Sequence, residues 1–123
     1  MEEYDLCVIG AGPSGYAAAM RAIDFGKKVV LIEKDKIGGA GLYNGALTSK
    51  TMWELSQKVR TVNSSIVSSG RSKFDLSWEQ VKTTMQEAVF DRKFQYSCHI
   101  KLLQSEELNQ SFKYERGFAS FID

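Results

Sequence analysis

Three glycines near the amino terminus constrain the fold of this chain most. Gly10, Gly12 and Gly15 form the pattern G-x-G-x-x-G, directly after the apolar run 4–9 (YDLCVI) and directly before an alanine-rich segment. This pattern between a strand and a helix is typical of a βαβ unit that binds the pyrophosphate of a dinucleotide. The first glycine permits a tight turn, the second lets the ligand approach the backbone, and the third lets the helix pack on the sheet.

The following residues complete a βαβ unit, which we expect over residues 4–33. The helix is predicted to begin at Pro13, whose fixed φ suits a first helical position, and to stop at Gly26. The run 29–32 (VVLI) predicts the second strand, and both strands read as buried on both faces of a parallel sheet. Glu33 ends this strand, where a carboxylate accepts hydrogen bonds from ribose hydroxyls and repels a 2′-phosphate.

The glycines divide the chain into two parts. Eight of the ten lie in residues 1–45, whereas residues 46–116 hold only Gly70 and no proline, so long helices are expected there. Apolar periodicity predicts a helix from Gly45 to Gly70, and a capping-box pattern at Ser77 predicts another over residues 77–107. Trp53 and Trp78 fall on these helices and are expected to be packing residues.

Alternating residues predict a strand region over residues 112–122. The predicted fold class is therefore α/β: a Rossmann-like βαβ unit followed by two long helices and a returning strand, which together make an incomplete doubly wound sheet. Between the βαβ unit and the second long helix, residues 38–69 are expected to form a loop followed by the first long helix.

Charge and composition exclude several classes of protein. The chain is 43% hydrophobic and 25% charged, as ordinary globular domains are, and its net charge of +1 does not favour nucleic acid or an anionic membrane as a partner. The acidic amino terminus is unlike a targeting segment, and no apolar run approaches the roughly 18 residues that span a bilayer. We therefore expect a cytoplasmic protein.

The few sulfur and imidazole groups do not form a metal or disulfide site. Cys7, Cys98 and the single histidine, His99, are too few and too widely spaced for zinc or a disulfide framework. Cys7 falls in a strand predicted to be buried, where cysteines are usually inert. Cys98 and His99 are adjacent on a predicted helix and point about 100° apart, so they do not form a nucleophile and base pair, and His99 is expected on the helix surface.

Residues 33–50 (EKDKIGGAGLYNGALTSK) resemble the FAD-binding start of the pyridine nucleotide-disulfide oxidoreductases, especially those like dihydrolipoamide dehydrogenase. The family pattern runs Glu, a few residues, Gly-Gly-Thr-Cys, four residues, Cys-Ile-Pro-Ser-Lys and a helix. This chain keeps Glu33, Gly38-Gly39, Gly45 and Ser49-Lys50 in register. The resemblance covers the whole chain and implies that residues 1–123 are the N-terminal portion of an FAD-binding domain.

The chain departs from the family pattern at the two redox cysteines, which are Gly41 and Ala46 here. Disulfide exchange requires a thiolate, and neither hydrogen nor a methyl group can replace it. No catalytic residue is therefore assigned, and disulfide reduction is not expected. The family threonine is Ala40 and the family proline is Thr48.

The resemblance also implies which residues contact the cofactor. Lys50 would lie beside the flavin N5 edge, although helix position alone makes it a solvated lysine whose charge opposes the helix dipole. The stretch from Gly117 resembles the one whose main chain touches adenine. The full set assigned to FAD is Gly10, Gly12, Pro13, Ser14, Gly15, Glu33, Lys34, Gly38, Gly39, Ala40, Lys50, Phe118 and Ala119.

Two classes of function remain open at this point. The first is an FAD-dependent oxidoreductase in which hydride passes from NAD(P)H, bound by a domain not present in this chain, to the flavin and then to a non-disulfide acceptor. That acceptor could be a second pyridine nucleotide, as in the similar soluble transhydrogenases, a quinone or oxygen, and the full-length protein is expected to be a homodimer. The second is a non-catalytic module that binds FAD or another adenine dinucleotide. A simple interaction scaffold leaves the spaced glycines and Glu33 unexplained.

Overall fold

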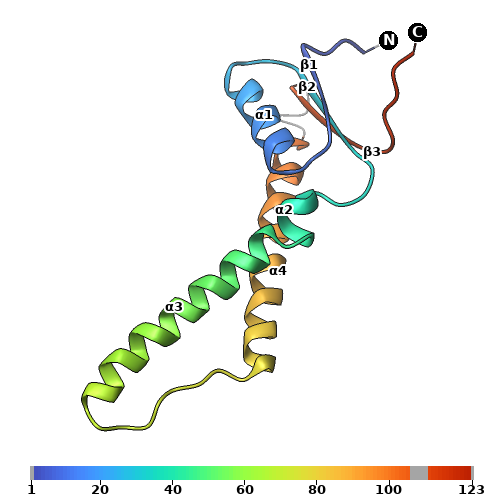
Figure 1. Cartoon of the computed structure of the whole chain (residues 1–123). Coiled ribbons are helices and arrows are strands. Elements are labelled where there is room, and N and C mark those ends of the chain that lie inside the picture. The colour runs from blue at the N-terminus through green and yellow to red at the C-terminus, as the bar shows by residue number, and fades with distance from the viewer. Residues whose placement is uncertain (1, 106–110, 123) are drawn as a thin grey trace.

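The computed structural model describes residues 2–105 and 111–122. A parallel three-stranded sheet with the order β1-β2-β3 forms the head of the molecule, and two long helices extend from it as a hairpin (Figure 1). The elements are β1 (Leu6–Ile9), α1 (Pro13–Asp24), β2 (Val29–Glu33), α2 (Gly39–Tyr43), α3 (Ala46–Ser68), α4 (Trp78–Leu103) and β3 (Phe112–Arg116).

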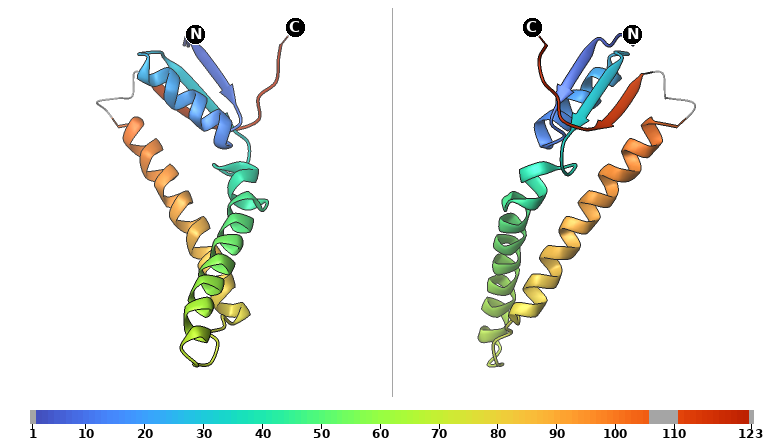
Figure 2. Two further views of the ribbon diagram at one scale, coloured as in Figure 1. Left: turned by 60° about the vertical axis from the view of Figure 1, so that its left-hand side comes forward. Right: turned by 90° about the vertical axis from the view of Figure 1, so that its right-hand side faces the viewer.

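One face of the sheet carries the core. The connections from β1 to β2 and from β2 to β3 step in the same direction, and right-handed crossovers then place their helices on the same face. Figure 2 shows α1 and the end of α4 on that face. The buried cluster there consists of Ala11, Ala19, Val29, Leu31, Ile100, Leu103 and Phe112. The predicted α/β class, with its βαβ unit, two long helices and returning strand, is confirmed.

The prediction that β1 is buried on both faces is wrong. Ile9 is 57% exposed and Cys7 is exposed, whereas Val29 and Leu31 in β2 are fully buried. The reason is position, because β1 pairs on one edge only and the described helices that cover the sheet, α1 and the end of α4, pack on one face. Cys7 is therefore not the buried cysteine that its apolar neighbours suggested.

The strand predicted over residues 112–122 is shorter in the structure. β3 ends at Arg116, which pairs with Glu33, the last residue of β2. Because β2 ends at Glu33, it offers no further residues with which the chain after Gly117 could pair. Phe118 is 80% exposed in this extended segment.

The second long helix begins as predicted and ends earlier. The Ser77 hydroxyl accepts a hydrogen bond from the backbone N–H of Gln80 (3.2 Å), and the Gln80 side chain accepts one from the Ser77 N–H (2.8 Å), which is the predicted capping box. The helix α4 ends at Leu103 rather than at residue 107, and residues 106 and 107 lie outside the described residues. The first helix, α1, likewise ends at Asp24, just before Gly26.

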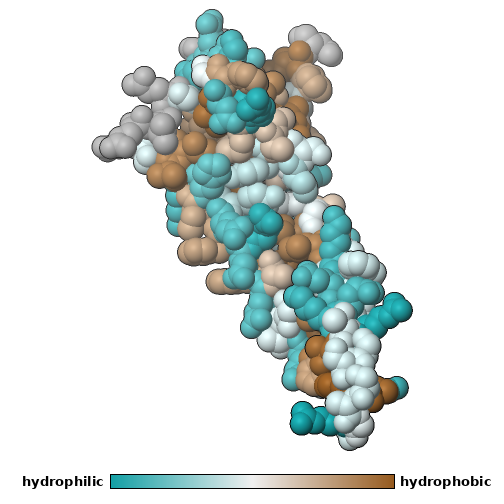
Figure 3. Space-filling model, turned by 90° about the vertical axis from the view of Figure 1, so that its left-hand side faces the viewer, coloured by the Kyte–Doolittle hydropathy of each residue, from teal (hydrophilic) through white to brown (hydrophobic). Residues whose placement is uncertain are grey.

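The hairpin of α3 and α4 is mostly solvated, and hydrophilic and hydrophobic surface alternate along it (Figure 3). Trp53 and Trp78 are 67% and 61% exposed, so the prediction that they are packing residues is wrong. Each helix has the other as its main partner over most of the hairpin, and only one stripe of each, such as Leu55 and Val59 in α3, is half-buried. Within residues 2–105 and 111–122, none of the helices is long and apolar enough to span a membrane.

Candidate dinucleotide-binding site

The predicted site residues gather at the carboxyl edge of the sheet. Since the strands are parallel, the loops that follow β1, β2 and β3 all leave from this edge, and Figure 2 shows the strands pointing toward α2 there. In open parallel sheets this edge is where ligands bind. The loop 10–15, the segment 33–39 and the segment 117–119 are thus brought together although they are distant in sequence.

The loop between β1 and α1 has the backbone that its glycines predict. Gly10 has φ of 98°, in the left-handed region, and its N–H donates to the Ile32 carbonyl at 2.7 Å. A Cβ at Gly15 would lie 2.0 Å from the Gly10 carbonyl oxygen, so α1 packs directly on the loop. A Cβ at Gly12 would meet no protein atom within 4 Å. The backbone at Gly12 therefore faces open space at the start of α1.

Glu33 is the one buried charged side chain of the described residues, with 8% exposure. Its Oε2 accepts the N–H of Ala11 at 2.7 Å, and its Oε1 accepts the N–H of Asp35 at 2.8 Å. Burial alone would raise the pKa of this carboxyl, but hydrogen bonds from backbone N–H groups and the charge of Lys34 hold the pKa below its usual value. Each carboxylate oxygen keeps lone pairs for a further donor, such as a ribose hydroxyl.

The glycine pair after β2 closes on the first loop. Gly38 has φ of 91°, and its N–H donates to the Ala11 carbonyl at 2.7 Å. A Cβ at Gly39 would lie 3.4 Å from the Gly12 Cα, so α2 begins beside the open backbone of Gly12. Ala40, in the first turn of α2, is exposed.

The segment after β3 is attached to the same edge. The Gly117 N–H donates to the Glu33 carbonyl at 3.0 Å, and the Lys34 ammonium lies 5.9 Å from the centre of the Phe118 ring. Ala119 follows and is half-buried. Pro13 and Ser14, in the first turn of α1, are exposed.

Lys50 lies in the second turn of α3, because α3 begins at Ala46. It is exposed, and together with Pro13, Gly41 and Ala46 it lines a cavity of about 310 Å³. A Cβ at Gly41 would lie 2.4 Å from Cγ of Pro13, so α2 touches the start of α1 at this point. The structure therefore places Lys50, Gly41 and Ala46 around one opening beside the glycine loop.

Comparison with known proteins decides the family. A profile of the family described as "Pyridine nucleotide-disulphide oxidoreductase" matches residues 4–117. This chain belongs to that family.

Several curated relatives are dihydrolipoyl dehydrogenases. The enzyme of Acholeplasma laidlawii is 38% identical over 80 residues, which are 62% of this chain and 24% of the relative. The mitochondrial enzyme of Schizosaccharomyces pombe is 35% identical over 123 residues, which are 98% of this chain and 23% of the relative. The chain thus spans about a quarter of the length of these family members.

A solved structure has the same fold. The Cu(II) complex of HOCl-induced flavoprotein disulfide reductase RclA from Escherichia coli matches with a TM-score of 0.67 and 19% identity, over 100% of this chain and 23% of that one. This likeness, together with the family match, confirms the resemblance and the Rossmann-like fold class that the sequence predicts.

One contact of this family member was not predictable from any local pattern. The Tyr16 hydroxyl in α1 and Nδ1 of His99 in α4 share a hydrogen bond, and the rings of Tyr16 and Tyr96 lie 4.4 Å apart. Burial raises the pKa of Tyr16, and the neighbouring Tyr96 adds to this. His99 lies on the exposed face of α4, as predicted, and it also joins α4 to α1 across 83 residues of sequence.

The buried carboxylate leads to a prediction about pH. Because the pKa of Glu33 is lowered on folding, its contribution to the free energy of unfolding is present above the ordinary value of 4.5 and is lost as pH falls through the folded value. Glu33→Gln should lower the free energy of unfolding at neutral pH by about 1.5–3 kcal/mol, because the amide nitrogen would face a backbone N–H donor. The variant should also lose less stability on acidification, as measured by chemical denaturation between neutral and acidic pH.

The matched control is Glu54→Gln, which breaks an exposed ion pair with Lys58 (3.0 Å) on α3. Exposed pairs contribute about 0–1 kcal/mol, so the control should resemble the parent protein. Identical pH profiles for Glu33→Gln and the parent would contradict the buried role of Glu33.

Proposed function

We propose that this chain is the FAD-binding segment of a dihydrolipoamide dehydrogenase-like flavoprotein oxidoreductase that uses NAD(P)H and has no redox-active disulfide. One observation carries the proposal: the open backbone at Gly12 lies between a buried Glu33 and the start of α2, in a chain of this family. The space that a Cβ at Gly12 would occupy is free for a ligand, so the residues fit a dinucleotide.

Each part of the site has a role in this proposal. The free N–H groups at the first turn of α1, with Ser14, bind the pyrophosphate, and the absence of a side chain at Gly12 permits the close approach. Glu33 accepts hydrogen bonds from the adenosine ribose, and its charge disfavours a 2′-phosphate. Lys34, Phe118 and Ala119 flank the adenine. FAD, when bound, supplies the hydride-accepting and hydride-donating chemistry that none of these side chains has.

The loss of both thiols determines the reaction class that we propose. Gly41 and Ala46 can neither attack a disulfide nor hold electrons, so electrons would leave the flavin directly for an acceptor that is not a disulfide. A second pyridine nucleotide, a quinone and oxygen are acceptors of this kind. The same proposal assigns NAD(P)H to a domain outside this chain, a homodimeric state to the full-length protein, and a cytoplasmic location.

The test uses the protein at the full length that its gene encodes, purified without added flavin. A yellow protein whose visible absorbance bleaches when NADH or NADPH is mixed in without oxygen supports an enzyme of this class. A yellow protein that neither nucleotide reduces would make the chain part of a non-catalytic FAD-binding module. A colourless protein that also fails to take up added FAD would refute the proposed cofactor.

Lys50 gives a prediction specific to the flavin. If its ammonium lies beside the flavin, it stabilises the negative charge that reduction adds, so Lys50→Met should lower the flavin midpoint potential by tens of millivolts, at about 30 mV per ~1.4 kcal/mol for a two-electron couple. The measurement is a spectroelectrochemical titration with FAD content checked. Lys58→Met, two turns farther along α3, should leave the potential unchanged. An equal midpoint potential for Lys50→Met and the parent would mean that Lys50 is a solvated surface lysine with no role at the flavin.

A further inference from the structure

We propose that the cavity beside Gly41 and Ala46 binds a small anion that carries carboxylate or phosphate groups, and that Lys50 and Arg92 hold it. The cavity lies where α1 begins, between the α2–α3 turn and α4, and has a volume of about 310 Å³. Its lining residues on which the argument depends are Pro13, Gly41, Ala46, Lys50, Arg92 and Tyr96.

The charge in this cavity has one sign. Lys50 comes from α3 and Arg92 from α4, and the described residues that line the cavity include no carboxylate. Among the ion pairs between described residues, none involves Lys50 or Arg92. Two cations from different helices that face one cavity raise the local concentration of anions.

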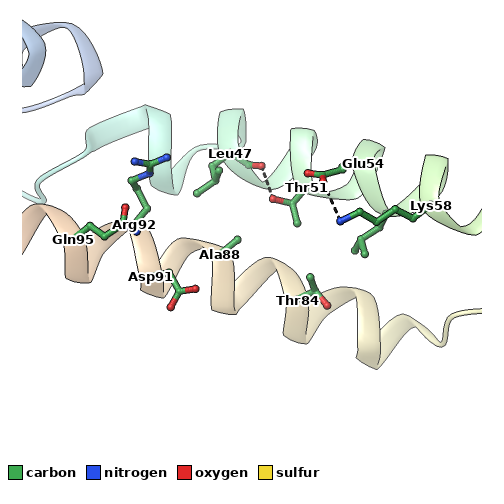
Figure 4. Close-up of a pocket in the computed structure, with 10 residues that line it drawn as sticks. Leu47, Thr51, Glu54, Lys58, Thr84, Ala88, Asp91, Arg92 and Gln95 are labelled. Carbon is green, nitrogen blue, oxygen red and sulfur yellow. Dashed lines mark hydrogen bonds and ion pairs between the residues drawn. The ribbon is translucent and has the colours of Figure 1, made fainter.

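Figure 4 draws the neighbouring pocket, which shares Leu47 and Arg92 with this cavity, and shows how Arg92 is directed. Its guanidinium extends from α4 toward the segment that joins α2 to α3, whereas the carboxylate of the adjacent Asp91 diverges from it. A guanidinium presents a planar fork of donors that matches a carboxylate or a phosphate in two parallel hydrogen bonds. Arg92 can therefore offer this fork to an anion in the cavity that Lys50 also lines.

The remaining walls are largely apolar. Pro13, Leu42 and Leu47 are apolar, and Leu42 is buried. Lys50 and Arg92 are themselves exposed, so the anion would bind at a solvent-accessible opening. Tyr96 adds one hydroxyl that can donate to the anion. Gly41 and Ala46, the positions where the family carries sulfur, also border this cavity and contribute little bulk.

Any role of this cavity in catalysis rests on the proposed function, which places the flavin beside Lys50. The binding of an anion does not depend on that function. The anionic group that Lys50 and Arg92 bind has two possible sources, a separate small anion or the pyrophosphate of FAD. The experiment distinguishes these two sources.

The experiment is a calorimetric titration of the full-length protein, as purified, with malonate and with inorganic phosphate. FAD content is determined separately from visible absorbance, so a colourless protein would count against the proposed function and would leave the anion measurement valid. We expect saturable binding of at least one probe, which Arg92→Met weakens about ten-fold or more through loss of a charge-assisted hydrogen bond. Arg60→Met, on the exposed surface of α3 outside the cavity, is the matched control and should bind as the parent does.

Three results would overturn the inference. The first is the absence of saturable binding of either probe to the parent protein. The second is equal weakening by Arg92→Met and Arg60→Met, or weakening by neither. The third is a loss of FAD affinity in Arg92→Met with no change in probe binding, which would assign the two cations to the cofactor pyrophosphate.

Discussion

The full-length protein is expected to reduce neither lipoamide nor glutathione disulfide with NADH or NADPH, in contrast to what the names of its relatives suggest. The family redox positions are Gly41 and Ala46, and neither Cys7 on the edge strand nor Cys98 on α4 is among the residues that line the cavity beside them. Thiol–disulfide exchange needs an attacking thiolate and a leaving thiolate, so the expected turnover is at background. The measurement is oxidation of the nicotinamide in the presence of each disulfide.

Restoring the cysteines provides the control. Neither Gly41→Cys nor Ala46→Cys alone can close a disulfide, so any gain of activity should require both substitutions. The structure adds a condition, since a Cβ at position 41 would lie 2.4 Å from Cγ of Pro13, and the proline ring must move. Normal disulfide turnover by the parent protein, or by either single variant, would contradict the assignment of these positions.

The second large effect is expected at Gly15. A Cβ there would lie 2.0 Å from the Gly10 carbonyl oxygen and 3.2 Å from Cγ1 of Val8, and the first of these atoms belongs to the backbone and cannot rotate away. Gly15→Ala must therefore push α1 off the loop that it covers. Overpacking of this kind costs about 1–3 kcal/mol or more, so we expect a fall of about 3 kcal/mol in the free energy of unfolding, together with loss of FAD.

Gly12→Ala is the matched variant, because a Cβ there meets no protein atom within 4 Å. The FAD-free form should keep its stability to within about 0.5 kcal/mol, whereas FAD affinity should fall because the methyl group occupies the space of the pyrophosphate. Denaturation of the FAD-free proteins and titration with FAD separate the two effects. Equal stability of the Gly15→Ala variant and the parent would contradict the packing of α1, and equal FAD affinity of Gly12→Ala and the parent would contradict the position of the ligand.

The local parts of this molecule could be predicted from the sequence because they depend on short-range chemistry. The turn at Gly10 needs a positive φ, the close approach at Gly15 needs the absence of Cβ, and the Ser77 capping box needs only residues three apart. The βαβ unit follows from these features and from two apolar runs.

The parts that sequence reasoning missed depend on which elements become neighbours. The exposure of Cys7 follows from β1 lying at an edge, and β3 stops at Arg116 because β2 ends at Glu33. The hydrogen bond between Tyr16 and His99 and the contact of Gly41 with Pro13 join segments that no periodicity connects. Glu33 lies between these cases: its place in the motif was predictable, but its bonds to the N–H groups of Ala11 and Asp35 were not.

The central claim is that the flavin is the only redox centre to which this part of the protein contributes. Anaerobic titration of the full-length protein with a two-electron reductant tests it most directly. A bound FAD takes up one two-electron equivalent, and a redox-active disulfide beside it would take up one more. The account predicts a yellow protein that is fully reduced by about one equivalent per FAD. An end point near two equivalents per FAD, or a protein that binds no flavin, would contradict it.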